Sequence, residues 1–178
     1  LGLARLLAPY QGHILVHIVP FTDLQLAIYE HCEESYAITI MRRMMYRIAE
    51  RLAQKQNCLA IVNGESIGQV ASQTLESMHT INAVTSMPII RPVATMDKVE
   101  IIDLARKVGT YETSIQPWED CCTIFTPKNP VTKPTIRRAE GLERRFDFET
   151  LLEACVEQTE SVHVYPTKPA EEEVSDLF

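Results

Sequence analysis

Two adjacent cysteines, Cys121 and Cys122, are the residues of this sequence whose position best suits sulfur chemistry. They follow Glu119 and Asp120 and precede a loop rich in proline and lysine, where a structural thiol has little hydrophobic core to join. A reactive thiolate at this place needs a neighbouring cation, because nearby carboxylates raise the pKa of a thiol. On these residues alone, a reactive sulfur and a pair of inert thiols are equally open.

The other cysteines and the histidines give no sign of a metal site. Cys32, Cys58 and Cys155 lie in apolar helical or strand contexts, which predicts small buried side chains. The sequence contains no CxxC pair for zinc, and its five histidines show no ligand spacing. Scattered cysteines of odd number, with no signal peptide, predict a protein of the reducing cytoplasm.

A second candidate site is the segment 63–69, Asn-Gly-Glu-Ser-Ile-Gly-Gln, which follows the apolar run at 58–62. Ligands of open parallel sheets bind outside the carboxyl ends of the strands, so this position suits a nucleotide. Gly64 and Gly68 let the backbone approach a ligand closely, and a helix that starts after them offers unpaired N–H groups. An ordinary strand-to-helix turn explains the same residues, so the segment alone identifies no ligand.

Basic side chains gather in one segment, although the net charge of the chain is −7. The segment 128–145 carries six of them: Lys128, Lys133, Arg137, Arg138, Arg144 and Arg145. The negative total argues against indiscriminate binding of polyanions, yet this cationic segment can pair with phosphates. A solvated helix face is the other reading of the same residues.

Alternating strand and helix patterns predict the elements that position these residues. Apolar runs rich in β-branched residues predict strands at 13–19, 58–62 and 87–93. Residues 34–54 show helical spacing, with Ile38, Met41, Met45, Ile48 and Leu52 on one face and Arg43, Arg47 and Arg51 on another. Further helices are predicted at 68–79, at 97–108 with Asp97 and Glu100 as a capping pair, and at 135–157. The first two strands are expected to be parallel.

Length and composition predict one α/β domain with a doubly wound, mostly parallel sheet. The chain has 178 residues, of which 46% are apolar, and it lacks the roughly 20-residue apolar stretch that a membrane span needs. We expect the domain to cover residues 1–163, and residues 164–178 to form an acidic, flexible tail. A helical pattern that begins at Leu1 without a cap predicts a truncated or processed N-terminus.

Three segments together resemble the tRNA 4-thiouridine synthetase (tRNA sulfurtransferase) family. They are GESIGQVASQT at 64–74, RPVATMDKVEIIDLARKVGTYETSI at 91–115 and EDCCTIFTPKNP at 119–130. The resemblance implies the PP-loop ATP pyrophosphatase fold, which is adenine nucleotide alpha hydrolase-like. The Ser-Gly-Gly-x-Asp-Ser phosphate loop of that fold does not occur in this sequence. The resemblance places this loop, and a tRNA-binding module with a THUMP domain, before Leu1.

The same resemblance implies a two-stage reaction on tRNA. ATP, with Mg²⁺ expected from the chemistry, adenylates the C4 oxygen of a uridine, and a cysteine persulfide then delivers sulfur as AMP leaves. A cysteine desulfurase is the implied sulfur donor, and some members of the family also supply sulfur for the thiazole of thiamine. The rhodanese-like domain of longer members, whose cysteine resolves the persulfide, is absent from this sequence. A homodimer that places tRNA across two subunits stays open.

The family motifs assign roles to individual residues of this sequence. Arg42, Gly64 and Gln73 match contacts to ATP or AMP, and Lys98 matches a basic residue near phosphate. Cys121 aligns with the persulfide-bearing cysteine, and Cys122 is a possible second thiol. With tRNA as the implied substrate, four residues of the basic segment are candidate tRNA contacts: Lys128, Lys133, Arg137 and Arg138.

Two other functions remain open from the sequence. A non-catalytic fragment that binds nucleotide or RNA would account for the basic segment and for the missing phosphate loop. A different PP-loop enzyme, such as a 2-thiouridine synthetase, would account for the fold, although the missing CxxC argues against metal-dependent thiolases.

Overall fold

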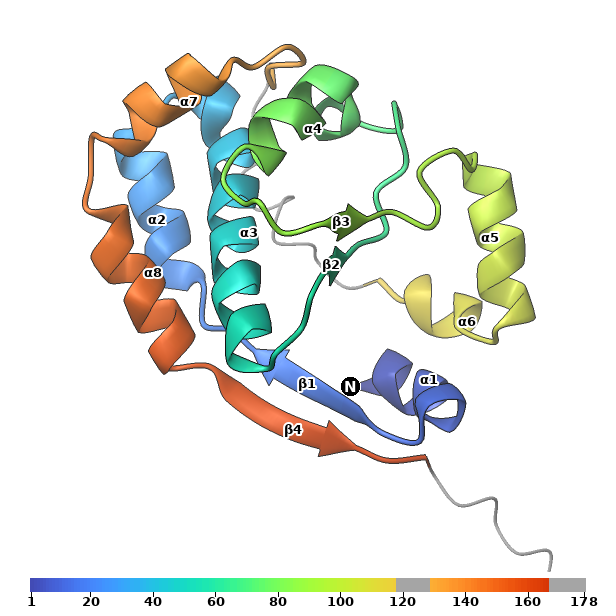
Figure 1. The fold of residues 1–178 in the computed structure, drawn as a ribbon. Coiled ribbons are helices and arrows are strands. Elements are labelled where there is room, and N and C mark those ends of the chain that lie inside the picture. Colours follow the sequence, from blue (N-terminus) through green and yellow to red (C-terminus); the bar gives the residue numbers. More distant parts are fainter. Residues whose placement is uncertain (118–128, 167–178) are drawn as a thin grey trace, which may run out of the picture.

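The structure, a computed structural model, describes residues 1–117 and 129–166 of the chain (Figure 1). In chain order the elements are α1 (Gly2–Gln11), β1 (Ile14–Ile18), α2 (Thr22–His31), the 3₁₀ helix η1 (Glu34–Tyr36), α3 (Ala37–Lys55), β2 (Ile61–Val62), the 3₁₀ helix η2 (Ala71–Gln73), α4 (Leu75–Asn82), β3 (Ile89–Ile90), α5 (Lys98–Lys107), α6 (Tyr111–Ser114), α7 (Ile136–Glu143), α8 (Phe148–Glu157) and β4 (Glu160–Val164). In these ranges no helix combines the length and the apolarity that crossing a bilayer requires.

Within the described ranges, the strands form two separate two-stranded ladders. β2 and β3 are parallel, with Ile61 opposite Ile89, whereas β1 and β4 are antiparallel, with Ile14 opposite Val164. In the described residues β1 and β2, the first two strands, are not paired with each other, because β1 takes its partner from the far end of the chain. The strand β4 also runs one residue past 163, where we expected the tail to begin.

The core lies between α3 and the helices α2, α7 and α8, which Figure 1 shows on one side of it. Its fully buried side chains come from all four helices and include Leu24, Ile40, Met44, Leu142 and Leu152. Burial of such side chains from water is the main favourable term in folding. This packing fixes α3 as the central helix that carries part of the candidate site.

The helix predicted at 34–54 is confirmed by η1 and α3, but its faces differ from the prediction. Met45 is 37% exposed, whereas Arg43 is only 1% exposed. Arg43 donates from Nε to Oε1 of Glu143 at 2.6 Å and from Nη1 to the carbonyl oxygen of Thr80 at 2.5 Å. A buried guanidinium is tolerated here because a buried carboxylate compensates its charge.

The carboxylate that compensates Arg43 also binds Arg47. Glu143 is 2% exposed and accepts hydrogen bonds from Arg47 Nη1 and Nη2, both at 2.9 Å. Burial alone would raise the pKa of Glu143, but the hydrogen bonds from Arg47 and Arg43 outweigh it and lower that pKa. The cluster joins α3 to α7.

Capping side chains decide where several helices begin. The predicted Asp97–Glu100 capping box is present at the start of α5, and Gly109, just after this helix, has φ 76°. The helix expected from residue 68 begins only at Leu75, because the Thr74 side chain caps α4 after the short η2 turn. The helix expected at 135–157 is two helices, α7 and α8, and Asp147 caps the second.

Candidate functional site

The candidate site lies where the chain leaves the carboxyl ends of β2 and β3. The two loops that follow these strands are joined by two hydrogen bonds. Ser66 Oγ donates to the carbonyl oxygen of Met96 at 2.7 Å, and Ile67 N donates to that of Ala94 at 2.9 Å. Parallel strands end at the same edge of a sheet, which is where ligands of open α/β sheets bind.

A pocket of about 480 Å³ lies between these two loops. Its lining residues are Ile67, Gly68, Gln69, Ala94, Thr95, Met96 and Asp97. Asp97 is also the N-cap of α5, so Lys98, the exposed first residue of that helix, follows directly on the lining. The pocket therefore combines backbone of the 63–69 segment with the start of a helix that carries a lysine.

A buried carboxylate, Glu65, lies at the centre of the site. Glu65 is 4% exposed, and its Oε2 accepts from Arg91 Nε at 2.7 Å, from Asn63 Nδ2 at 2.8 Å and from Tyr46 Oη at 3.1 Å. Arg42 Nη2 forms an ion pair with Oε1 of the same carboxylate. The donors come from α3 and from the ends of β2 and β3, so Glu65 ties these three parts together.

Arg42 and Gln73, two of the predicted ATP contacts, reach the same region from different elements. Arg42 Nη1 donates to the carbonyl oxygen and to Oγ of Ser72 in η2, each at 3.1 Å. Gly68 N donates to the carbonyl oxygen of Gln73 at 2.8 Å, which closes the loop between β2 and η2. The side-chain Oε1 of Gln73 is buried and has no hydrogen-bond partner in residues 1–117 and 129–166. Buried polar atoms are normally paired, so this oxygen needs an explanation.

Gly64, the third predicted ATP contact, lies in the exposed part of the same loop. A Cβ built on Gly64 would meet no atom within 4 Å among the described residues, so the space beside its backbone is open. Arg42 on α3 thus bonds to Ser72, in the segment that also holds Gly64 and Gln73. Sequence reasoning missed Glu65 and Arg91, although Glu65 lies inside the same motif and Arg91 directly follows an apolar run.

Three basic side chains of the segment 128–145 lie away from the pocket beside α5. Lys133 lies 3.9 Å from Glu76, and Arg138 forms an ion pair with Glu33. Arg137 is exposed on α7, which Figure 1 places on the side of α3 away from α5. These residues therefore do not join the pocket beside α5.

The predicted reactive residues Cys121 and Cys122, and the basic residue Lys128, lie outside the described residues. Of the other cysteines, Cys155 is buried and Cys32 is partly buried, whereas Cys58 is exposed, so the prediction of a buried Cys58 is wrong. Burial raises the pKa of the Cys32 thiol to about 11 and also raises that of Cys155. Both thiols are therefore poorly suited to nucleophilic chemistry near neutral pH.

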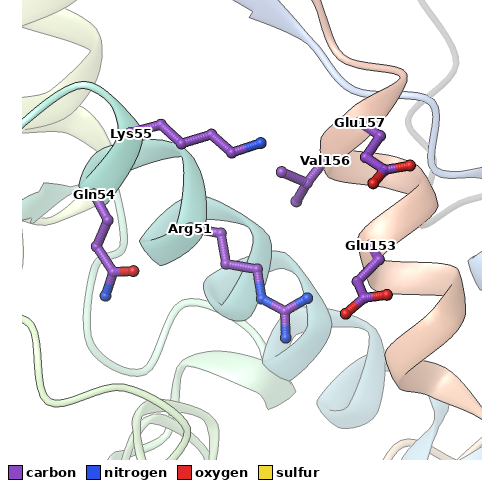
Figure 2. Close-up of a pocket in the computed structure, with 6 residues that line it drawn as sticks. All are labelled: Arg51, Gln54, Lys55, Glu153, Val156 and Glu157. Carbon is purple, nitrogen blue, oxygen red and sulfur yellow. The ribbon is translucent and has the colours of Figure 1, made fainter.

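A second groove, of about 620 Å³, lies between α3 and α8 (Figure 2). In Figure 2, Arg51 and Lys55 extend from α3 toward Glu153 and Glu157 on α8. Arg51 and Lys55 lie in the last turns of α3, whereas Arg42 lies near the beginning of this helix. Opposite charges face each other across this groove, and none of the predicted site residues that the structure describes lines it.

The family model for "Thiamine biosynthesis protein (ThiI)" matches residues 2–148, which is most of the chain. The chain belongs to the ThiI family. This assignment favours the predicted sulfurtransferase family over another PP-loop enzyme.

Curated relatives of this ThiI family member are called "probable tRNA sulfurtransferase". The Bacillus pumilus protein is 54% identical over 178 residues and the Bacillus subtilis protein is 50% identical over 178 residues. Each alignment covers 100% of this chain and 44% of the relative. The chain therefore spans less than half the length of the curated relatives it matches.

A solved structure of a similar protein is a 4-thiouridine synthetase–RNA complex with bound ATP. It is 40% identical, has a TM-score of 0.86, and is matched over 90% of this chain and 42% of that one. This match confirms the predicted α/β fold of the PP-loop type.

Proposed function

We propose that this ThiI chain supplies the nucleotide-binding part of an ATP-dependent tRNA sulfurtransferase that makes 4-thiouridine. The observation that carries the proposal is that Arg42, from α3, bonds to Ser72 in the segment after β2 that also holds Gly64 and Gln73. Its support is the family match, together with the related 4-thiouridine synthetase structure, which is an RNA complex with bound ATP.

The residues at this site fit an adenine nucleotide. The buried Gln73 Oε1 without a partner among the described residues is an acceptor for an amino group such as that of adenine. The open space beside Gly64 allows a ligand to approach the backbone, and the Arg42 side chain retains 18% exposure. Lys98, at the start of α5, is the candidate that offsets phosphate charge, with Mg²⁺ accompanying the triphosphate.

The chemistry that follows from the family is adenylation and sulfur transfer. The C4 oxygen of a tRNA uridine attacks the α-phosphate of ATP and releases pyrophosphate, which converts this oxygen into part of a good leaving group. The terminal sulfur of a persulfide on Cys121 then attacks C4 and AMP departs. A second thiol, either Cys122 or an external one, releases the sulfur to the base by forming a disulfide with Cys121.

The partners of this reaction are part of the proposal. A cysteine desulfurase charges Cys121, and a polypeptide segment with the phosphate loop and a THUMP domain completes the ATP and tRNA sites. Lys128, Lys133, Arg137 and Arg138 contact tRNA phosphates, for which Arg138 must give up its ion pair with Glu33. The enzyme acts in the cytoplasm, and supply of sulfur for the thiazole of thiamine is a second use of the same persulfide.

Replacement of the proposed persulfide carrier tests this function. In the complete protein, Cys121→Ala should abolish 4-thiouridine in tRNA, as measured by mass spectrometry of digested nucleosides, while ATP binding stays at the wild-type level. The matched control is Cys58→Ala, which removes an exposed thiol from another part of the chain and should leave 4-thiouridine unchanged. Wild-type 4-thiouridine content in the Cys121 variant would contradict the assignment of Cys121 as the persulfide carrier.

A further inference from the structure

We infer that Glu65 is a positioning residue of the nucleotide site, which acts by holding the guanidinium of Arg42 in place for ATP. The inference rests on the proposed function and adds a residue that the sequence analysis did not assign to the site. Glu65 is almost fully buried, so it is not itself placed to touch the nucleotide.

The guanidinium of Arg42 is held by polar contacts on two sides. One side of its guanidinium, Nη2, faces Oε1 of Glu65, and the other side, Nη1, bonds to both oxygen acceptors of Ser72. A guanidinium on a long, flexible side chain is fixed only when such planar contacts hold it from more than one side. Glu65 and Ser72 therefore together hold the Arg42 guanidinium beside the loop that carries Gln73, and Glu65 is the charged member of this pair.

Glu65 also binds a second arginine, Arg91, through its other carboxylate oxygen. Arg91 donates from Nε to Oε2 of Glu65 at 2.7 Å and from Nη2 to Oδ1 of Asn82 at 2.8 Å, which also anchors the end of α4. Without the carboxylate, two like charges would share a part-buried space with no anion between them. Arg42, which retains 18% exposure, is then free to turn away from the site.

The chain offers a closely matched control for this role. Glu143 is also a buried carboxylate, and it also holds two arginines, Arg43 and Arg47. Its cluster joins α3 to α7 and includes none of the predicted ATP contacts. The two glutamates therefore share charge, burial and the number of arginine partners, and differ in whether one of those partners is a predicted nucleotide contact.

The experiment measures ATP affinity of the complete protein by isothermal titration, at a temperature well below every unfolding midpoint. Glu65→Gln should raise the Kd for Mg·ATP by about tenfold or more, whereas Glu143→Gln should change it less than about twofold despite a comparable fall in Tm. An equal loss of affinity in both variants would overturn the inference, because it would show that Glu65 affects ATP binding only through the general stability of the fold.

A double-mutant cycle separates action through Arg42 from an independent effect. If Glu65 works by positioning Arg42, then Arg42→Gln alone and Arg42→Gln with Glu65→Gln should have nearly the same Kd. Effects of the two changes that multiply would contradict the inference. If Glu65→Gln does not fold, Glu65→Asp takes its place in the cycle, because it keeps the charge and shortens the reach to Arg42. Its predicted Kd lies about threefold or more above wild type, and wild-type affinity would overturn the inference.

Titration of the wild-type protein separates a failure of the proposed function from a failure of the role inferred for Glu65. A wild-type protein that does not bind Mg·ATP would contradict the proposed function and this inference with it. If the wild type binds ATP and Arg42→Gln weakens binding while Glu65→Gln does not, the proposed function stands and only the role of Glu65 is wrong.

Discussion

Two buried glutamates, Glu65 and Glu143, organise the described part of the chain at the scale of single residues. Each holds two arginines that reach it from α3 or from the end of a strand. Local patterning could not reveal this. Arg43, Arg47 and Arg51 follow a helical spacing typical of a solvated face, and the partner that buries Arg43 lies 100 residues further along the chain. Long-range charge pairing thus decided which arginines are exposed.

The Glu143 cluster makes a prediction about stability. Glu143→Gln removes the charge that compensates Arg43 and should lower the free energy of unfolding by about 3–5 kcal/mol, the usual cost of breaking a buried pair. Urea denaturation at pH 7 measures this loss. The exposed pair of Arg106 and Asp103 is the control, because Asp103→Asn should cost less than about 1 kcal/mol. A small loss for both changes would contradict the assignment of a buried pair.

The same carboxylate makes a prediction about acid. The pKa of Glu143 is lower in the folded chain than in the unfolded chain, so its contribution is fully present above the unfolded value, about 4.3. The contribution is lost as pH falls through the lower, folded value. Urea titrations from pH 7 to pH 3 should therefore show a shallower acid loss for Glu143→Gln than for wild type. Parallel acid limbs would contradict the lowered pKa.

The three described cysteines should differ in reactivity. Burial raises the pKa of Cys32 to about 11, so its thiolate is scarce at pH 8, and Cys155 is buried with a raised pKa. Cys58 is exposed, so it should be alkylated by iodoacetamide well before the other two. Peptide mapping by mass spectrometry after short exposures gives the order. Faster labelling of Cys32 than of Cys58 would show that α2 opens more readily than the structure indicates.

At the scale of elements, the start of α5 was predictable from its capping residues, whereas the caps of α4 and α8 were missed. The Asp97–Glu100 pair was predicted and is a capping box, because both partners lie within one turn. Strand pairing was not predictable to the same degree. The pattern of β1 shows a strand but not its partner. That partner, β4, is supplied by residues 160–164, after the helices α2 to α8 and the strands β2 and β3.

The capping box at α5 can be tested separately from catalysis. Asp97→Ala leaves the first backbone N–H groups of α5 without their acceptor and should lower the free energy of unfolding by about 1 kcal/mol. Asp97→Asn should keep most of the free energy of unfolding that Asp97→Ala loses, since asparagine is also a good N-cap. Chemical denaturation of both variants provides the measurement. Equal stability of Asp97→Ala and wild type would show that α5 contributes little to cooperative unfolding.

At the scale of the whole molecule, the family motifs assigned Arg42, Gly64 and Gln73 to one ligand, which the periodic patterns could not do. In the structure Arg42 bonds to Ser72, next to Gln73 in the segment after β2. The motifs did not reveal Glu65 or Arg91 as the groups that organise this segment, because burial and pairing are properties of the folded chain. The roles of Cys121, Cys122 and Lys128, which lie outside the described ranges, are predictions, as are the nucleotide contacts of Arg42, Gly64, Gln73 and Lys98.

The most direct test of the central claim is the 4-thiouridine content of tRNA in cells that lack the gene. Mass spectrometry of nucleosides from a deletion strain should show complete loss of 4-thiouridine, with other modified nucleosides unchanged. Reintroduction of the complete wild-type gene should restore the nucleoside, and the Cys121→Ala form should not. Undiminished 4-thiouridine in the deletion strain would contradict the assignment of this ThiI family member as the tRNA sulfurtransferase.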